Sequence, residues 1–142
     1  MVGICYKLTA WTLAVFMPLV FAAPVFAAPL NYTIDFTVTL TDASVDFTIL
    51  SGATATSLVV NAGNIIVTVG ADENFTLRSP RAISLSGQTS AAKYSINCPG
   101  GASASTSNLS LSTTSGSEVV TITPQGSGVS CAPLNSGGGG GG

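Results

Sequence analysis

The stretch NYTIDFTVTL, residues 31–40, decides the fold class of this chain. Apolar and aromatic residues alternate with threonine and aspartate along the whole segment, and a period of two is typical of a β-strand with one buried face. We therefore expect one strand whose apolar side chains enter a core while its polar side chains meet water. The expected inward set is Tyr32, Ile34, Phe36, Val38 and Leu40.

A second alternating segment, VDFTIL at 45–50, follows the turn residues TDAS at 41–44. Turn chemistry between two alternating runs predicts a β-hairpin, with Val45, Phe47 and Ile49 facing inward. The same signature recurs to the end of the chain. The further predicted strands are ATSLVV (55–60), NIIVTV (64–69), NFTLR (74–78), AISLS (82–86), AAKYSINC (91–98), SNLSLST (107–113) and EVVTITP (118–124).

These segments predict an all-β domain of about seven to nine short, mainly antiparallel strands. Ile65, Val67 and Val69 should share one buried face, and Pro124 should end the last strand. No segment after residue 27 shows a helical period of adequate length. A small β-sandwich is the expected fold, with a small β-barrel as the alternative.

The first 27 residues have the pattern of a secretory signal peptide. A single lysine, Lys7, precedes an apolar run, and small residues stand around Ala27. Cleavage after Ala27 would release residues 28–142. The alternative is an uncleaved membrane anchor, against which Pro18 and Pro24 argue because proline interrupts a straight helix. We expect a secreted or cell-surface protein that touches the membrane only if this leader is uncleaved.

Charged residues make up only 7% of the chain, against about 25% in an average globular protein. After the leader the cations are Arg78, Arg81 and Lys93, so a basic nucleic-acid footprint is missing and no nucleic-acid partner is expected. Arg78 and Arg81 could bind an anionic sugar, but solvated side chains beside a turn are the simpler interpretation. The surface should consist mostly of Ser, Thr, Asn and Gly.

Two cysteines remain after the leader, Cys98 and Cys131, because Cys5 would be removed with it. An even pair in an exported chain predicts a disulfide. Tyr94, Ile96 and Cys98 fall on one predicted strand face. A metal site is the competing interpretation, but the chain has no histidine and no CxxC motif, so no metal is expected.

The sequence offers little catalytic chemistry. Without histidine there is no ordinary catalytic triad, and no cofactor-binding fingerprint occurs, so we expect neither an enzyme nor a cofactor. Asp35 and Asp46 could face each other across the first hairpin as a hydrolytic carboxylate pair. Both fall on the outward strand phase, where a solvated charge that protects a sheet edge is the more common role.

Three further groups of residues are candidate binding or modification sites. The loop Asp72-Glu73-Asn74, with Asp42 as an additional donor, could contribute oxygen ligands to Ca²⁺, although a charged loop tip explains it as well. Glycosylation sequons begin at three asparagines, Asn31, Asn74 and Asn108. A carbohydrate-binding surface would have to use Tyr32, Tyr94 or a phenylalanine, because the only tryptophan, Trp11, lies in the leader.

The expected organisation is a signal peptide at 1–27, a β-sandwich domain at 28–134 and a Gly-rich flexible tail or linker at 135–142. The segments ILSGATATSLVV and VVTITP and the Gly-rich tail resemble the sandwich modules of uncharacterised bacterial envelope and surface proteins. That resemblance implies a non-enzymatic structural or adhesive module. Its partners would be other surface proteins, copies of itself or glycans.

Two other functions remain open. The alternating strand at the new N-terminus could leave its own sheet and complete a neighbour's, which would make the chain a subunit of an extracellular filament. Local pairing with residues 45–50 is the simpler expectation for that strand. The second alternative is a carbohydrate-binding module.

Overall fold

The computed structural model describes residues 28–101 and 103–135 of the 142-residue chain. The predicted leader and residues 136–142 of the predicted tail lie outside the described residues. The described residues form only β-strands and the turns between them. In chain order the strands are β1 (Leu30–Asn31), β2 (Phe36–Leu40), β3 (Val45–Ile49), β4 (Thr54–Ala55), β5 (Ser57–Val60), β6 (Ile65–Gly70), β7 (Asn74–Ser79), β8 (Ile83–Ser86), β9 (Ala92–Asn97), β10 (Ser107–Thr113), β11 (Ser117–Pro124) and β12 (Leu134–Asn135).

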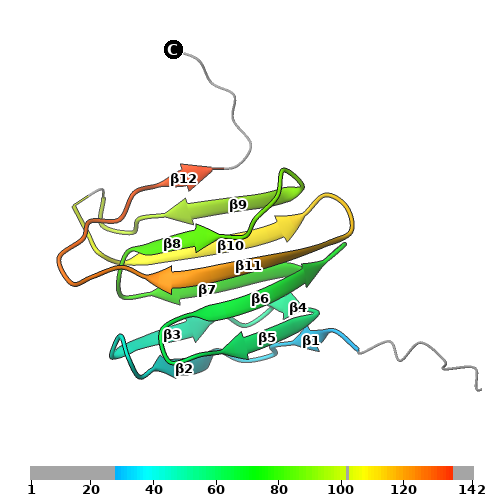
Figure 1. The fold of residues 1–142 in the computed structure, drawn as a ribbon, viewed down its shortest axis with the longest axis horizontal. Helices are drawn as coiled ribbons and strands as arrows, with labels where there is room; N and C mark the ends of the chain where they lie inside the picture. Colours follow the sequence, from blue (N-terminus) through cyan, green and yellow to red (C-terminus); the bar gives the residue numbers. More distant parts are fainter. Residues whose placement is uncertain (1–27, 102, 136–142) are drawn as a thin grey trace, which may run out of the picture.

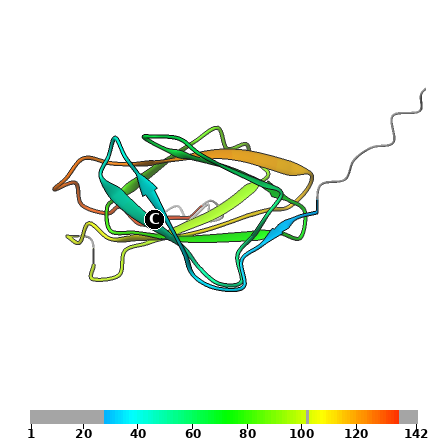
Figure 2. The same cartoon turned by 90° about the horizontal axis from the view of Figure 1, so that it is seen from below.

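The strands form two main sheets and one short ribbon. The larger sheet has the order β12-β9-β10-β7-β3-β2, the smaller has the order β5-β6-β11-β8, and β1 pairs with β4. Neighbouring strands pair antiparallel. Figure 1 shows β2 and β5 on one side of the molecule and β12 on the opposite side, and Figure 2 shows the two sheets as two layers. The fold is a small β-sandwich, as predicted from the sequence.

The core lies between the two layers and is filled from both. The smaller sheet contributes the set predicted from its alternation, Ile65, Val67 and Val69, each with no exposed surface. The larger sheet contributes two large side chains, Phe47 and Phe75, which are also fully buried. Because side chains on a strand alternate between faces, each sheet also presents an outer face, which is where a partner has access.

The predicted hairpin at residues 36–49 is confirmed. Strands β2 and β3 pair from Phe36 opposite Ile49 to Leu40 opposite Val45. Strand β10 has the predicted bounds, and β11 ends at Pro124 as expected. In the part of the chain that the structure describes, nine strands are longer than two residues, which is within the predicted range of seven to nine.

The prediction that residues 31–40 form one strand with a single buried face was wrong in its first half. The chain bends after β1, so that only β2 continues the predicted strand. Val38 and Leu40 are buried as expected, but Ile34 is 72% exposed and Phe36 is 50% exposed. The backbone around Tyr32 is bonded to a different segment, since Tyr32 N–H donates to Ala53 O at 3.0 Å.

Two smaller differences concern segment ends. The predicted strand at 55–60 is divided into β4 and β5, with β4 held by β1 rather than by the larger sheets. The predicted domain end at residue 134 falls inside β12, because Asn135 pairs with Ser95 of β9. The first residue of the predicted tail is therefore part of the sandwich.

Candidate functional site

The outer face of the six-stranded sheet is polar throughout its centre. The register places Arg78 of β7 opposite Thr48 of β3 on one side and opposite Asn108 of β10 on the other. Asn108 in turn lies opposite Asn97 of β9. Because Leu77 and Ile96 point into the core, these four polar residues all belong to the outer face, where they form a continuous row across four strands.

This face carries more positive than negative charge. Arg78 and Lys93 both point outward and are exposed, whereas Asp46 is the acidic residue on the same face. Strand spacing and rise put Arg78 and Lys93 about 17 Å apart. The Asp46 carboxylate is engaged by its cross-strand neighbour, since Thr39 Oγ1 donates to Asp46 Oδ1 at 2.7 Å. Arg81 is half-buried beyond the end of β7, where its backbone N–H donates to Ser79 Oγ at 3.0 Å.

The candidate carboxylate pair does not form. Asp46 lies opposite Thr39 in the hairpin, while Asp35 precedes β2 at the other end of the strand. Asp35 Oδ1 accepts the backbone N–H of Ser51 at 2.8 Å, which holds it in a turn. Four residues of extended chain, about 13 Å, separate Asp35 from the position that faces Asp46. The two aspartates therefore do not face each other, and the solvated outward role remains the interpretation for Asp46.

The candidate calcium loop is occupied by its own hydrogen bonds. Glu73 Oε2 accepts the backbone N–H of Gly70 at 2.6 Å and the hydroxyl of Thr56 at 3.1 Å. Asn74 Oδ1 accepts the hydroxyl of Ser110 at 3.3 Å. Within the described part of the chain, no group of three or more His, Cys, Asp or Glu side chains is placed to hold a metal ion. Asp42 lies in a different turn, beside Gly63.

The three sequon asparagines have different surroundings. Asn31 is exposed in the short strand β1, and Asn74 is exposed at the start of β7. Asn108 is half-buried in the centre of the six-stranded sheet, and its Oδ1 is buried without a hydrogen-bond partner. Asn31 and Asn74 are thus both exposed, and the side-chain oxygen of Asn74 already accepts the hydroxyl of Ser110.

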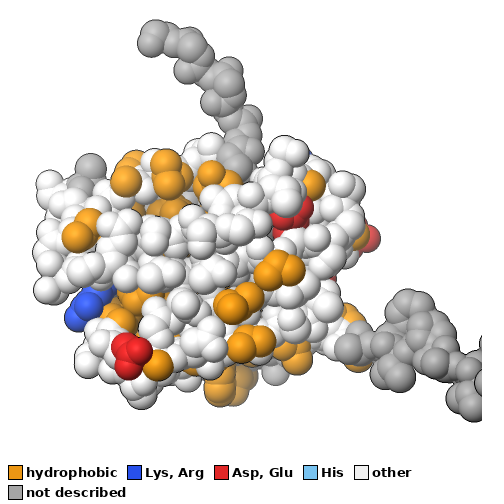
Figure 3. All heavy atoms as spheres, viewed as in Figure 1, with side chains coloured by type: hydrophobic (Ala, Val, Ile, Leu, Met, Phe, Trp, Pro, Cys, Tyr) orange, Lys and Arg blue, Asp and Glu red, His pale blue; other side chains and the backbone are white. Residues whose placement is uncertain are grey.

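The outer face of the four-stranded sheet has a different character. Its residues are Ser, Thr, Val, Ile and Gly, and the register places Val59 beside Ile66 and Val119 beside Thr68. Val59 is 49% exposed and Val119 is 51% exposed. Figure 3 views this side of the molecule and shows a mainly uncharged surface with apolar groups near its centre.

Three apolar side chains before and at the start of β2 are exposed, a feature that sequence reasoning missed. Leu30, Ile34 and Phe36 are each more than one third exposed. The Phe36 ring stands 6.3 Å from the ring of Tyr32. Burial raises the pKa of the Tyr32 hydroxyl above its ordinary value of 10.0. The alternation that predicted Ile34 and Phe36 to face inward carries no information about where the strand begins or ends.

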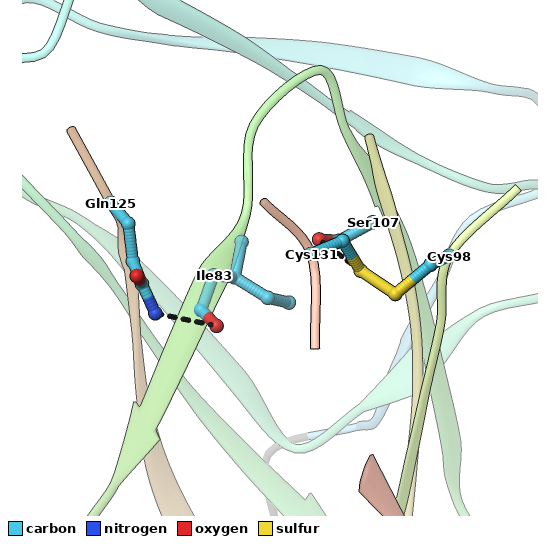
Figure 4. Close-up of a disulfide and its surroundings, with 5 residues drawn as sticks. All are labelled: Ile83, Cys98, Ser107, Gln125 and Cys131. Atoms are coloured by element: carbon cyan, nitrogen blue, oxygen red, sulfur yellow. Dashed lines mark hydrogen bonds between the residues drawn. A yellow bond between two sulfur atoms is a disulfide. The ribbon is translucent and has the colours of Figure 1, made fainter. Parts of the chain in front are cut away.

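The disulfide is present between the predicted cysteines. Figure 4 shows the Cys98–Cys131 bond, with an S–S distance of 2.05 Å and a Cα–Cα distance of 5.7 Å, beside the hydroxyl of Ser107. Ser107 Oγ donates to Cys131 Sγ at 3.3 Å. In the same view Gln125 Nε2 donates to Ile83 O at 3.4 Å. The segment after β11 is thus attached to both sheets.

Comparisons with known proteins add no relative. No family model matches this chain, and neither the curated proteins nor the solved structures gave a match. The resemblance to bacterial envelope modules therefore stays a prediction. Within residues 28–101 and 103–135, no helix has the length and apolar character needed to cross a membrane. What the structure defines is a small, disulfide-bonded β-sandwich.

Proposed function

We propose that this chain is a non-enzymatic structural and adhesive module, secreted or held at the cell surface. The observation that carries the proposal is the contrast between a filled core and two outer sheet faces of low charge, one rich in Ser, Thr and Asn and the other composed of Ser, Thr, Val, Ile and Gly. Outer faces of this kind offer contact area to a partner, whereas a catalytic site usually lies in a cleft that encloses the reacting group.

Export is supported by two independent features. The first 27 residues have the pattern of a signal peptide. The Cys98–Cys131 disulfide belongs to an oxidising compartment, because cytosolic thiols are kept reduced. Expression of residues 1–142 in a secreting host, with mass spectrometry of the exported product, tests both. We expect a product that begins at Ala28 and carries no free thiol, and a cytoplasmic product that begins at Met1 would contradict export.

Adhesion can be tested with beads coated with residues 28–142. Their retention under gentle flow is measured on surfaces that carry the same protein, an acidic polysaccharide or a neutral polysaccharide, with albumin-coated beads as the control. We expect retention above the control on at least one surface, and no release of new sugar ends from either polysaccharide. Retention equal to albumin on every surface would contradict an adhesive role, and released sugar ends would indicate an enzyme.

A second candidate function is binding of an acidic glycan on the outer face of the six-stranded sheet. The row through Arg78 and Asn108 favours it, because a guanidinium flanked by amides and hydroxyls suits carboxylate and sulfate groups. Retention on immobilised heparin, compared between Arg78→Gln and the control Arg81→Gln, tests it. Equal loss in the two variants would indicate unspecific charge attraction.

The filament hypothesis stays a prediction. In the structure β2 pairs with β3 of the same chain over five residues. A donor-strand exchange would have to replace that pairing before the N-terminal segment could reach a neighbour.

A further inference from the structure

Strand β2 forms one edge of the six-stranded sheet. It pairs with β3 on one side, and no other strand of the described residues lies along its opposite side. An edge strand exposes alternate backbone N–H and C=O groups, which can pair with a strand from another chain. The edge of β2 is therefore a place where a further strand can be added.

The composition of β2 lacks the features that usually protect such an edge. Its sequence is FTVTL, with no charged residue and no proline. Natural edge strands are commonly blunted by lysine, proline, a bulge or very short length. The other edge of the same sheet, β12, is only two residues long. Phe36 at the start of β2 also leaves 50% of its surface exposed.

We propose that β2 pairs antiparallel with β2 of a second copy of this chain, so that two six-stranded sheets join across a two-fold axis. In the register centred on Val38, Thr37 lies opposite Thr39 of the second copy, and Phe36 lies opposite Leu40. The two threonines are exposed on the outer face in the single chain. A two-fold interface uses the same strand on both copies, so that one unprotected edge is sufficient.

The charges near the edge permit this register. Asp35 and Asp42 flank β2 at its two ends. Both lie outside the strand, where Asp35 accepts the backbone N–H of Ser51 and the backbone N–H of Asp42 donates to Ala62 O at 2.9 Å. No pair of like charges is placed in direct opposition, a situation that would weaken cross-strand pairing.

The expected dimer is weak. One strand pair buries less surface than the roughly 1,600 Å² of a standard interface, so we expect dissociation in the range of tens of micromolar or above. This pairing extends the proposed structural role by naming a partner, a second copy. If β2 does not pair with a second copy, the expected retention of beads on polysaccharide is unchanged. The dimer and the adhesive role can therefore be disproved separately.

The first test is the solution mass of residues 28–142 by light scattering at about 5 and about 500 µM, a range that brackets a weak interface. We expect the mass to rise from one chain toward two. The variant Thr37→Lys/Thr39→Lys places lysines opposite lysines across the axis and should stay monomeric. The matched control Ser84→Lys/Ser86→Lys puts the same charges on the exposed face of the β8 edge and should dimerise like the parent. Circular dichroism checks that each variant is folded.

Strand β5 is also an edge and lies on the same side of the molecule. The variant Ser57→Lys/Val59→Lys charges its outer face and should leave the dimer intact. The proposal is overturned if the parent stays monomeric at the higher concentration, if the β2 variant still dimerises, or if the β5 variant alone abolishes the dimer. A mass that grows beyond two chains also overturns it, because a two-fold pair is closed.

Disulfide cross-linking tests directly which residues of the two β2 strands lie opposite each other. Paired residues on antiparallel strands have Cβ atoms close enough for a disulfide. An equal mixture of Thr37→Cys and Thr39→Cys chains should form more cross-linked dimer than either variant alone. Efficient cross-linking of Thr37→Cys with itself would contradict the register centred on Val38.

Discussion

Glu118 accepts two hydrogen bonds from one residue, Thr89. The backbone N–H of Thr89 donates to Glu118 Oε2 at 3.1 Å, and its hydroxyl donates to Glu118 Oε1. Glu118 is only 4% exposed, because it shares the inward phase of β11 with Val120 and Ile122. The carboxylate thus connects the four-stranded sheet to the turn between β8 and β9.

Removal of the Thr89 hydroxyl should destabilise the domain. Thr89→Val keeps the shape of the side chain but leaves one carboxylate oxygen of Glu118 buried without its donor. We expect a loss of about 1–3 kcal/mol in unfolding free energy, measured by urea denaturation. Thr121→Val on the outer face of β11 is the control and should change stability by less than about 0.5 kcal/mol. A double-mutant cycle with Glu118→Gln should show coupling, and additive losses would contradict the direct interaction.

The disulfide should supply a large part of the stability of this small domain. Cys98 and Cys131 are 33 residues apart, so the loop-entropy model gives a loss of about 3.7 kcal/mol for Cys98→Ala/Cys131→Ala. Urea denaturation of the oxidised parent and the double variant measures it. Ser107→Ala, which keeps the disulfide and loses only the contact with Cys131 Sγ, should cost much less. Equal losses would show that local packing, and not the cross-link, is the source of the stability.

Two phenylalanines of the first hairpin test the boundary of the buried face. Phe47 has no exposed surface, whereas Phe36 is 50% exposed. Phe47→Leu should therefore cost about 1–2 kcal/mol in unfolding free energy through lost contacts and an unfilled volume. Phe36→Leu should cost less than about 0.5 kcal/mol. Equal costs would mean that Phe36 belongs to the core, as its sequence phase predicts.

These two residues also show what the sequence could and could not predict. Alternation correctly assigned Val45, Phe47 and Ile49 to the core, because a strand buried on one face must place every second side chain there. It failed at Ile34 and Phe36, because the pattern does not reveal what lies across from each residue. Here the chain bends toward residues 51–55, and Asp35 is held by Ser51.

The same limit applies to the candidate sites. The cysteine pair was predictable, since an exported chain with two cysteines has one possible disulfide. The Arg78 and Asn108 row was not, because it depends on how β7 and β10 are aligned and these strands are distant in the sequence. The burial of Glu118 could have been predicted, because Glu118 has the same strand phase as the apolar residues Val120 and Ile122. The predicted strand at 118–124 did not include a prediction of which side chains face inward.

Stability at alkaline pH should depend on Tyr32. Burial raises the pKa of its hydroxyl in the folded domain above 10.0, the ordinary value that the unfolded chain retains. Between these two values the folded state binds more protons than the unfolded state, so the unfolding free energy falls as the pH rises through this window. The stabilisation from the protonated Tyr32 hydroxyl is fully present below pH 10 and is lost above it.

Absorbance titration of Tyr94→Phe in residues 28–142, where Tyr32 is the remaining tyrosine, should give a titration midpoint above pH 10.0. Tyr32→Phe should remove this part of the alkaline loss of stability, and a midpoint at or below 10 would contradict the burial of the hydroxyl.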